Sequence, residues 1–180
     1  VIEVAMEGLS PEFTRHFFYD GEEGAARAAD PPAVAKACGL QGLMHGVHLD
    51  SWCFEPCGFS LNGLEDGYYF PIHIPPEPQM SFASFETNHP AYVSAAFTER
   101  LLKVFAPQDA TVLVMSRSFR SHASPAADAD AMPLAPVAAP SIVRGFECVR
   151  ETTEQLMPSV GASCVVLSAH GDDMHKIAVA

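Results

Sequence analysis

Residues 52–88 read WCFEPCGFSLNGLEDGYYFPIHIPPEPQMSFASFETN, and this stretch decides how the chain folds. Apolar residues alternate with other residues over Tyr68–Ile74, which is the period of a β-strand. A further strand is predicted at Met80–Thr87, with Phe82, Ser84 and Glu86 on one side and Ala83 and Phe85 on the other. The glycines within Gly58–Gly67 predict that the chain turns before the first of these strands. The stretch therefore predicts part of a β-sheet.

The strand predicted at Tyr68–Ile74 has two chemically different faces. Pro71 cannot donate a hydrogen bond to a neighbouring strand, so we expect this strand to lie at a sheet edge or to carry a bulge. One face is apolar and the other carries reactive groups. The apolar face comprises Tyr68, Phe70, Ile72 and Ile74, and the second comprises Tyr69, Pro71, His73, Pro75 and, if the chain stays extended, Glu77.

The rest of the chain predicts an α+β fold, with a mainly antiparallel sheet and helices on one face. Further strands are expected near residues 2–6, 43–54, 111–119, 142–155 and 163–169. Helices are expected at 10–19, ended by Gly21 and Gly24, at 33–38, and at 88–105. An Ala/Pro/Asp-rich segment at 122–140 predicts a flexible loop.

This arrangement leaves one sheet face uncovered. If the helices cover one face, nothing in the chain covers the other, and an apolar sheet face of that extent usually marks a partner surface. A second layer is therefore missing from these residues, or another chain provides it. The uncovered face carries Tyr69, His73, Glu77, Phe82 and Glu86.

The composition limits the class of protein. The 180 residues, 48% hydrophobic and 18% charged, suit one globular domain. The 22 acidic against 10 basic side chains argue against nucleic acid or an anionic membrane and suit a small cationic ligand. The sequence has no long apolar run and no basic region at its start, and its five cysteines are irregularly spaced. We therefore expect a cytoplasmic protein with reduced thiols, and a fragment or processed product because the first residue is Val1.

Metal binding receives little support from the sequence. Cys53 and Cys57 are spaced like half of a zinc site, but a second closely spaced ligand pair is lacking. His45 with His48, and the segment 170–175 with its two histidines, are more typical of solvated loops. We therefore expect no metal site.

Three segments together resemble a known enzyme family. They are FEPCGFSLNG at 54–63, IHI followed by PEP within 72–78, and SFASFETN at 81–88. In this order they are similar to the C-terminal half of eukaryotic S-adenosylmethionine decarboxylase, the pyruvoyl enzyme of polyamine synthesis. The sequence at 52–58 looks most like that of the trypanosomatid branch of the family. A looser similarity runs from Ile2 to the last strands.

The resemblance implies a fold and a place within it. The family fold is a four-layer αββα sandwich of two similar halves, with the active site between the two sheets. Residues 1–180 look like the C-terminal half, which would explain the uncovered face. The expected partners are therefore the N-terminal half of the same enzyme or a paralogous subunit.

The resemblance also implies site residues. Phe54 matches the aromatic ring that stacks on the substrate's adenine, and Glu77 matches the carboxylate that holds the ribose hydroxyls. Ser60 and His73 match the pair that assists self-processing of the proenzyme. Without the resemblance, Phe54 would be read as core, Glu77 and Ser60 as turn residues, and His73 as a hydrogen-bonded packing residue.

Glu3 and Glu86 match acids that are associated with putrescine activation in the animal enzymes. An exposed position on a strand is the competing reading for both. Pro71 and Pro75 stand where the family usually has threonines around the histidine, and Gln79-Met80 replaces an acidic-aromatic pair. These departures leave the strand geometry near His73 open.

The resemblance implies a cofactor that these residues do not supply. A pyruvoyl group acts as a covalently built electron sink for decarboxylation of S-adenosylmethionine, which supplies aminopropyl groups for spermidine and spermine. In the family, the serine that becomes pyruvoyl lies in an acidic-Ser-Ser motif of the N-terminal half, as does the proton-donating cysteine. No Glu-Ser-Ser occurs in this sequence. We therefore expect the pyruvoyl group in an N-terminal part, and a chain that is incomplete as a catalyst.

Two other functions stay open at this stage. The first is a catalytically dead paralogue that acts as a regulatory partner of the active decarboxylase. Retention of Phe54, Ser60, His73 and Glu77 together argues against it, since a dead copy need not keep all four. The second is an unrelated metal-binding α/β domain, which would require the motif match to be accidental.

Overall fold

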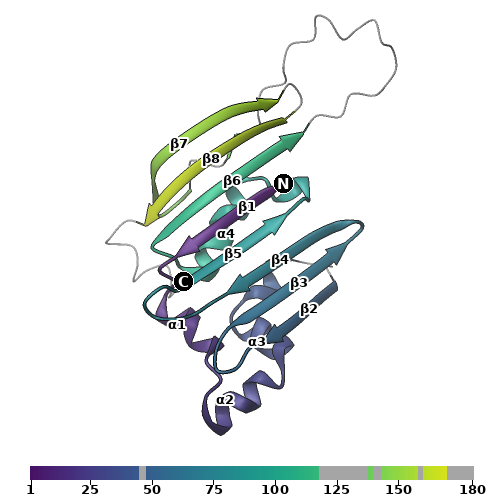
Figure 1. Cartoon of the computed structure of the whole chain (residues 1–180), viewed down its shortest axis with the longest axis vertical. Helices are drawn as coiled ribbons and strands as arrows, with labels where there is room; N and C mark the ends of the chain where they lie inside the picture. The colour runs from purple at the N-terminus through teal and green to yellow at the C-terminus, as the bar shows by residue number, and fades with distance from the viewer. Residues whose placement is uncertain (45–47, 118–137, 140–142, 158–159, 170–180) are drawn as a thin grey trace, which may run out of the picture.

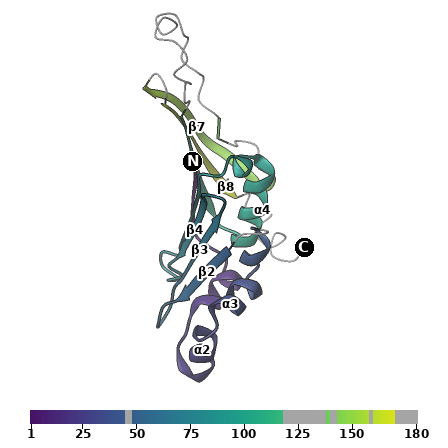
Figure 2. The same cartoon turned by 90° about the vertical axis from the view of Figure 1, so that its right-hand side faces the viewer.

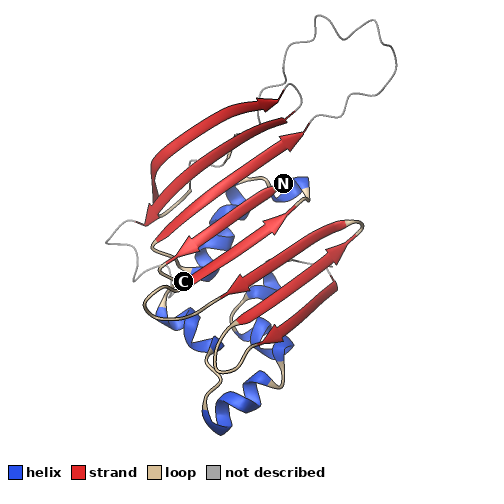
Figure 3. Ribbon diagram, viewed as in Figure 1, coloured by secondary structure: helices blue, strands red, loops and turns tan. Residues whose placement is uncertain are grey.

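The computed structural model describes residues 1–44, 48–117, 138–139, 143–157 and 160–169. These residues form one eight-stranded sheet in the order β2-β3-β4-β5-β1-β6-β8-β7, and every neighbouring pair is antiparallel (Figures 1 and 3). The strands are β1 (Ile2–Glu7), β2 (His48–Cys53), β3 (Phe59–Glu65), β4 (Tyr68–Ile74), β5 (Phe82–Thr87), β6 (Asp109–Arg117), β7 (Phe146–Met157) and β8 (Val160–Ala169).

The helices lie on one side of this sheet (Figure 2). They are α1 (Pro11–Thr14), α2 (Gly21–Ala28), α3 (Pro31–Ala37) and α4 (Ala95–Phe105), with the short 3-10 turns η1 (Arg15–Phe17), η2 (Leu40–Gly42) and η3 (Pro90–Tyr92). The predicted fold class is therefore confirmed. We call the other side, which no helix of the described residues covers, the open face. Among the described residues, none of the helices has the length and apolar character needed to cross a membrane.

Serine and aspartate caps fix where the helices begin. The Ser10 hydroxyl accepts from the Phe13 N–H at 3.2 Å, and the Asp30 carboxylate accepts from the Ala33 N–H at 3.1 Å. In both cases proline follows the cap, where its missing N–H costs nothing. The predicted helix start at Ser10 is thereby confirmed, and the helix predicted at 33–38 begins two residues earlier, at Pro31.

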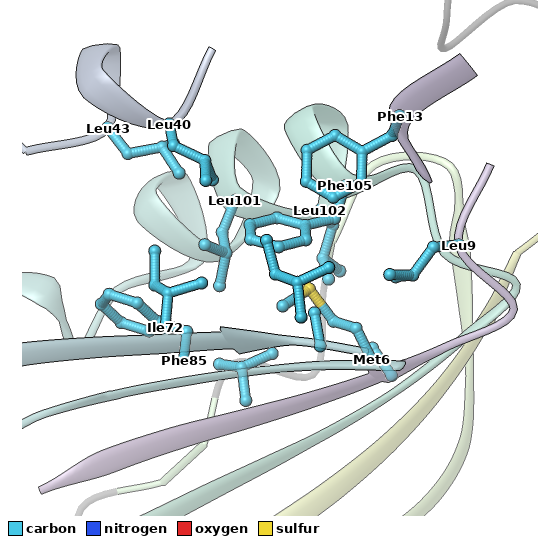
Figure 4. Close-up of a cluster of buried hydrophobic side chains, with 14 of the residues drawn as sticks. Met6, Leu9, Phe13, Leu40, Leu43, Ile72, Phe85, Leu101, Leu102 and Phe105 are labelled. Carbon is cyan, nitrogen blue, oxygen red and sulfur yellow. The ribbon is translucent and has the colours of Figure 1, made fainter. Parts of the chain in front are cut away.

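The core lies between the helices and the inner face of the sheet (Figure 4). Phe105 of α4 packs against Phe13 in a tilted arrangement, with ring centroids 4.7 Å apart. From Phe13 the ring contacts continue to Phe17 at 5.1 Å and on to Phe59 of β3 at 5.4 Å. A line of aromatic rings therefore joins the outer helix layer to Phe59, the residue that precedes Ser60 on β3.

One strand was wrongly predicted to be a turn. Residues 59–65 form β3, in which Phe59, Leu61 and Gly63 are buried and the residues between them face the open side. The turn itself is confined to Asp66 and Gly67, which have φ values of 47° and 84°. Two successive positive φ values are typical of the tight turn of a β-hairpin.

Other boundaries also differ from prediction. The glycines at 21 and 24 do not end a helix but belong to α2. Gly24 packs so closely that a Cβ there would lie 2.4 Å from the carbonyl carbon of Tyr19, so the backbones meet at this point. The helix expected from Asn88 begins only at Ala95, capped by Ser94. The flexible loop predicted at 122–140 falls, apart from 138–139, outside the described residues.

Of the two alternatives predicted for Tyr68–Ile74, the edge strand is wrong, because β4 lies between β3 and β5, and the register of β4 with β3 carries no bulge at Pro71. Pro71 is paired with Asn62 of β3. On the other side the register between β4 and β5 covers only Ile72 with Phe85 and His73 with Ser84. On this side Pro71 itself is unpaired, and pairing begins only at the next residue, Ile72. A residue without an N–H is tolerated at such a position inside a sheet.

Candidate active-site wall

Ser60 and His73 form a direct pair on the open face. They are opposite one another on β3 and β4, and the Ser60 Oγ lies 2.9 Å from the His73 Nδ1. The hairpin turn creates this contact, because a two-residue turn fixes which residues of the two strands face each other. The imidazole is exposed and the hydroxyl is half-buried. A histidine held in this way keeps its second ring nitrogen available for proton transfer.

Phe54 lies at the end of the sheet next to this pair. Strands β2 and β4 run in the same direction, because each is antiparallel to β3. Their C-terminal ends therefore lie at the same end of the sheet. The Phe54 N–H donates to the Gly58 carbonyl at 2.9 Å, which closes a tight loop. Gly58 has φ of 116°, and a Cβ there would touch the Phe54 Cβ at 3.4 Å. The Phe54 ring, 46% exposed, is therefore held by the backbone yet free to stack on a ligand.

Glu77 follows the C-terminal end of β4, at this same end of the sheet. Burial raises the pKa of the neighbouring Cys57 thiol, and the negative charge of Glu77 raises that pKa further, so the carboxylate lies near the Phe54–Gly58 loop. The Met80 N–H donates to the Glu77 carbonyl at 3.0 Å and fixes the backbone. The Glu77 side chain is exposed. It can therefore offer two acceptor oxygens to a pair of hydroxyls.

Glu3 and Glu86 form a second group on the open face. They are paired across β1 and β5, and both are half-buried. The Tyr69 hydroxyl donates a hydrogen bond to the Glu86 carboxylate. This bond, with burial and the charge of Glu86, raises the pKa of Tyr69 to about 12. Tyr69 was predicted to share a face with His73, but its contact with Glu86 was not predicted.

The structure brings these six residues onto one face in two groups. Ser60, His73, Phe54 and Glu77 gather at the end of the β3–β4 hairpin opposite its turn, while Glu3 and Glu86 lie on β1 and β5. Ser84 connects the groups, since it pairs with His73 and precedes Glu86 by two residues on the same face. Among the described residues, no group of three histidine, cysteine or acidic side chains could hold a metal ion.

Two surface hollows of the described residues lie among the helices, and both are bordered by Leu43, Arg100 and Lys103. Neither is lined by Ser60, His73, Phe54 or Glu77. We give more weight to the residues on the sheet, because they combine a hydrogen-bonded imidazole, an exposed ring and a free carboxylate. We therefore treat these residues of the sheet as the candidate functional site.

Comparison with known proteins agrees with this arrangement. The profile of the adenosylmethionine decarboxylase family matches residues 1–165. The S-adenosylmethionine decarboxylase proenzyme of Leishmania donovani is 38% identical over 114 residues, which cover 63% of this chain and 29% of that protein. The proenzyme of Xenopus laevis is 36% identical over 119 residues, which cover 65% of this chain and 34% of that protein. The chain thus spans about a third of the length of these relatives.

A solved structure shows the same fold. The crystal structure of the Trypanosoma brucei AdoMetDC-delta26 monomer matches with a TM-score of 0.72 and 25% sequence identity, over 94% of this chain and 65% of that one. The predicted resemblance is confirmed by the family profile, the relatives and this structure together. The chain belongs to the adenosylmethionine decarboxylase family and corresponds to the C-terminal half of its eukaryotic members.

Proposed function

We propose that this chain forms one wall of the active site of an S-adenosylmethionine decarboxylase, which supplies aminopropyl groups for spermidine and spermine synthesis. The observation that carries the proposal is the 2.9 Å contact between Ser60 Oγ and His73 Nδ1 on the open face. Phe54 and Glu77 lie beyond the C-terminal ends of β2 and β4, next to that pair. There they can bind a substrate that has an aromatic base and vicinal hydroxyls. The relatives named as decarboxylase proenzymes support this assignment.

The residues on the open face fit a pyruvoyl group contributed by the N-terminal part of the protein. When bound covalently there, such a group supplies the electron sink for decarboxylation. The fit rests on His73, which is exposed and uses only Nδ1 in its contact with Ser60. Nε2 is therefore available to a group on a facing sheet.

Each of the six candidate site residues has a defined role in the proposed function. Phe54 stacks on the adenine, and Glu77 accepts the ribose hydroxyls. During self-processing Ser60 steadies the ester formed at the cleavage point, and His73 removes the α-proton from that residue. Glu3 and Glu86 supply negative charge to a diamine effector of the putrescine type.

The role of His73 is tested by replacing it in the full-length protein. We expect His73→Ala to stall processing at the ester stage, because His73 is the base paired with Ser60 among the described residues. His48→Ala is the matched control, since His48 is an exposed histidine at the start of β2. Gel electrophoresis and intact mass measurement would follow chain cleavage. Normal accumulation of cleaved His73→Ala protein would overturn the role given to His73.

Mass spectrometry of the native protein tests the proposal against its main alternative. An N-terminal pyruvoyl group on the processed chain supports the decarboxylase. Its absence, together with stimulation of an active relative on mixing, would assign the protein as a regulatory paralogue instead.

A further inference from the structure

Basic side chains gather at one of the two hollows on the helix side of the sheet. This hollow lies where α1 and η1 meet the end of α3 and the C-terminal half of α4, and Arg15, Arg100 and Lys103 line it. Of the described residues that line it, Glu12 alone carries a carboxylate. The chain as a whole has 22 acidic and 10 basic side chains. A positively charged hollow is therefore a local exception on an acidic protein. We call it the basic hollow.

The positive charges of the basic hollow have no carboxylate partner in the described part of the chain. The ion pair found near it joins Arg144 to Glu99 at 3.7 Å and leaves the lining cations out. Arg100 instead lies over the ring of Phe97, 5.6 Å from the ring centroid. Lys103 follows Arg100 by three residues on α4, so the two side chains are neighbours on the helix surface, where like charges repel. These cations are therefore available to a negatively charged ligand.

The basic hollow has the dimensions of a small-molecule site. Its cavity volume is about 640 Å³, and ligand pockets typically enclose about 300–1,000 Å³. Phe13, Leu43 and Val104 give it an apolar part. A Cβ at Gly39 would lie 3.7 Å from Val104 Cγ1, so the end of α3 packs directly against α4 at this point. A ligand can therefore rest on apolar side chains while its charged groups contact the cations.

His16 provides a sensor of the charge in the basic hollow. It is half-buried and lines the hollow. Burial lowers the pKa of His16, and the positive charges of Arg15 and Arg27 lower that pKa further. An anion bound beside the imidazole would favour its charged form and raise the pKa again, whereas a cation would lower it. The sign of the change therefore reports the charge of the ligand.

We propose that the basic hollow binds a small polyanion that carries a chain of phosphate groups. Guanidinium groups bind phosphate oxygens in pairs, and an ammonium group adds a compact positive charge. A chain of phosphates offers enough oxygens and charge for several cations at once. The inference is independent of the proposed function, because the helices and the hollow lie on one side of the sheet, and Ser60 and His73 lie on the other (Figure 2).

The test measures the binding of two phosphate chains to the full-length protein. Inorganic tripolyphosphate and UTP are the probes, because neither contains the adenine assigned to Phe54. Isothermal titration calorimetry, in a buffer free of phosphate and divalent cations, gives each Kd. A lower Kd for UTP than for tripolyphosphate would assign the hollow to nucleoside phosphates, and equal values would assign it to phosphate chains alone.

Substitutions locate the binding within the hollow. We expect Arg100→Gln and Lys103→Gln each to weaken tripolyphosphate binding about 5-fold, and the double variant to weaken it about 25-fold. Arg150→Gln is the matched control, since it removes the same charge from an exposed position on β7 and should leave the Kd unchanged. Circular dichroism would verify that each variant keeps its fold.

The imidazole of His16 gives a second readout at the site itself. Saturating tripolyphosphate should raise the pH midpoint of its NMR titration, and His16→Gln identifies its signal. The signals of His48, on the open face, should not change.

Three results would overturn this inference. They are the absence of binding by either probe at up to about 10 mM, equal weakening by Arg150→Gln and by the double variant, and an unchanged His16 titration at saturation. Decarboxylation of S-adenosylmethionine enters none of these measurements, so failure of the proposed function is recognised separately.

Discussion

Phe105 provides a direct test of the packing that supports the sheet. Its side chain is completely buried at the C-terminal end of α4, and its ring packs against Phe13 at 4.7 Å (Figure 4). Replacing a buried phenylalanine with alanine typically costs about 3–5 kcal/mol, from lost burial and from the cavity left behind. A domain is stable by only about 5–15 kcal/mol, so Phe105→Ala should remove a large share of the stability.

Urea denaturation followed by circular dichroism would measure this loss. With a slope of about 2 kcal/mol per molar urea, a loss of about 4 kcal/mol lowers the midpoint by about 2 M. Lys103→Ala is the control on the same helix, because Lys103 is exposed and its loss should change stability by less than about 0.5 kcal/mol. A double substitution with Phe13→Ala should cost less than the sum of the two single changes, since the rings contact one another.

The result that would refute this packing is clear. If Phe105→Ala and Lys103→Ala shift the midpoint equally, α4 does not pack on the sheet as described. If the Phe105→Ala and Phe13→Ala losses are strictly additive, the ring contact contributes nothing beyond burial.

Two further predictions concern the Glu3–Glu86 pair and the buried thiol of Cys38. Glu86→Gln should raise the putrescine concentration needed for half-maximal activation of the full-length enzyme about tenfold or more. Glu7→Gln, an exposed change at the end of β1, should not raise it. Equal responses of the two variants would contradict an effector role for Glu86. Burial raises the pKa of Cys38 to about 11. The thiol of the folded protein should therefore resist alkylation through pH 9, whereas the exposed Cys148 reacts; mass-spectrometric labelling would check this, and equal labelling would contradict it. Because the folded pKa of Cys38 exceeds its unfolded value, its contribution to stability is complete below about pH 9 and is lost as the pH rises through about 11.

Strands with strict alternation could be predicted from the sequence, and strands interrupted by glycine could not. Tyr68–Ile74 was predicted with the bounds of β4, because its apolar and polar residues alternate without a break. β3 was missed because Gly63 lies within it and because the whole span between Gly58 and Gly67 was interpreted as a turn. The signal that could have identified β3 is Asp66-Gly67, a dipeptide typical of tight hairpins.

The same signal would have predicted the central contact of the site. A two-residue turn at Asp66 and Gly67 fixes the register of the hairpin and places Ser60 opposite His73. By contrast, the bond from Tyr69 to Glu86 depends on how β5 approaches β4 after an irregular loop. Periodicity carries no information about that approach, and the insertion of β1 between β5 and β6 is equally non-local.

The sparse pairing between β4 and β5 gives one side-chain contact a structural role. The paired register between these strands covers only two residue pairs, whereas β3 and β4 share seven and β1 and β5 share six. The register thus divides the sheet into a part of three strands and a part of five. The bond from the Tyr69 hydroxyl to the Glu86 carboxylate crosses between the two parts and complements the sparse backbone pairing there. It therefore links the strands that hold Ser60 and His73 to the strands that hold Glu3 and Glu86.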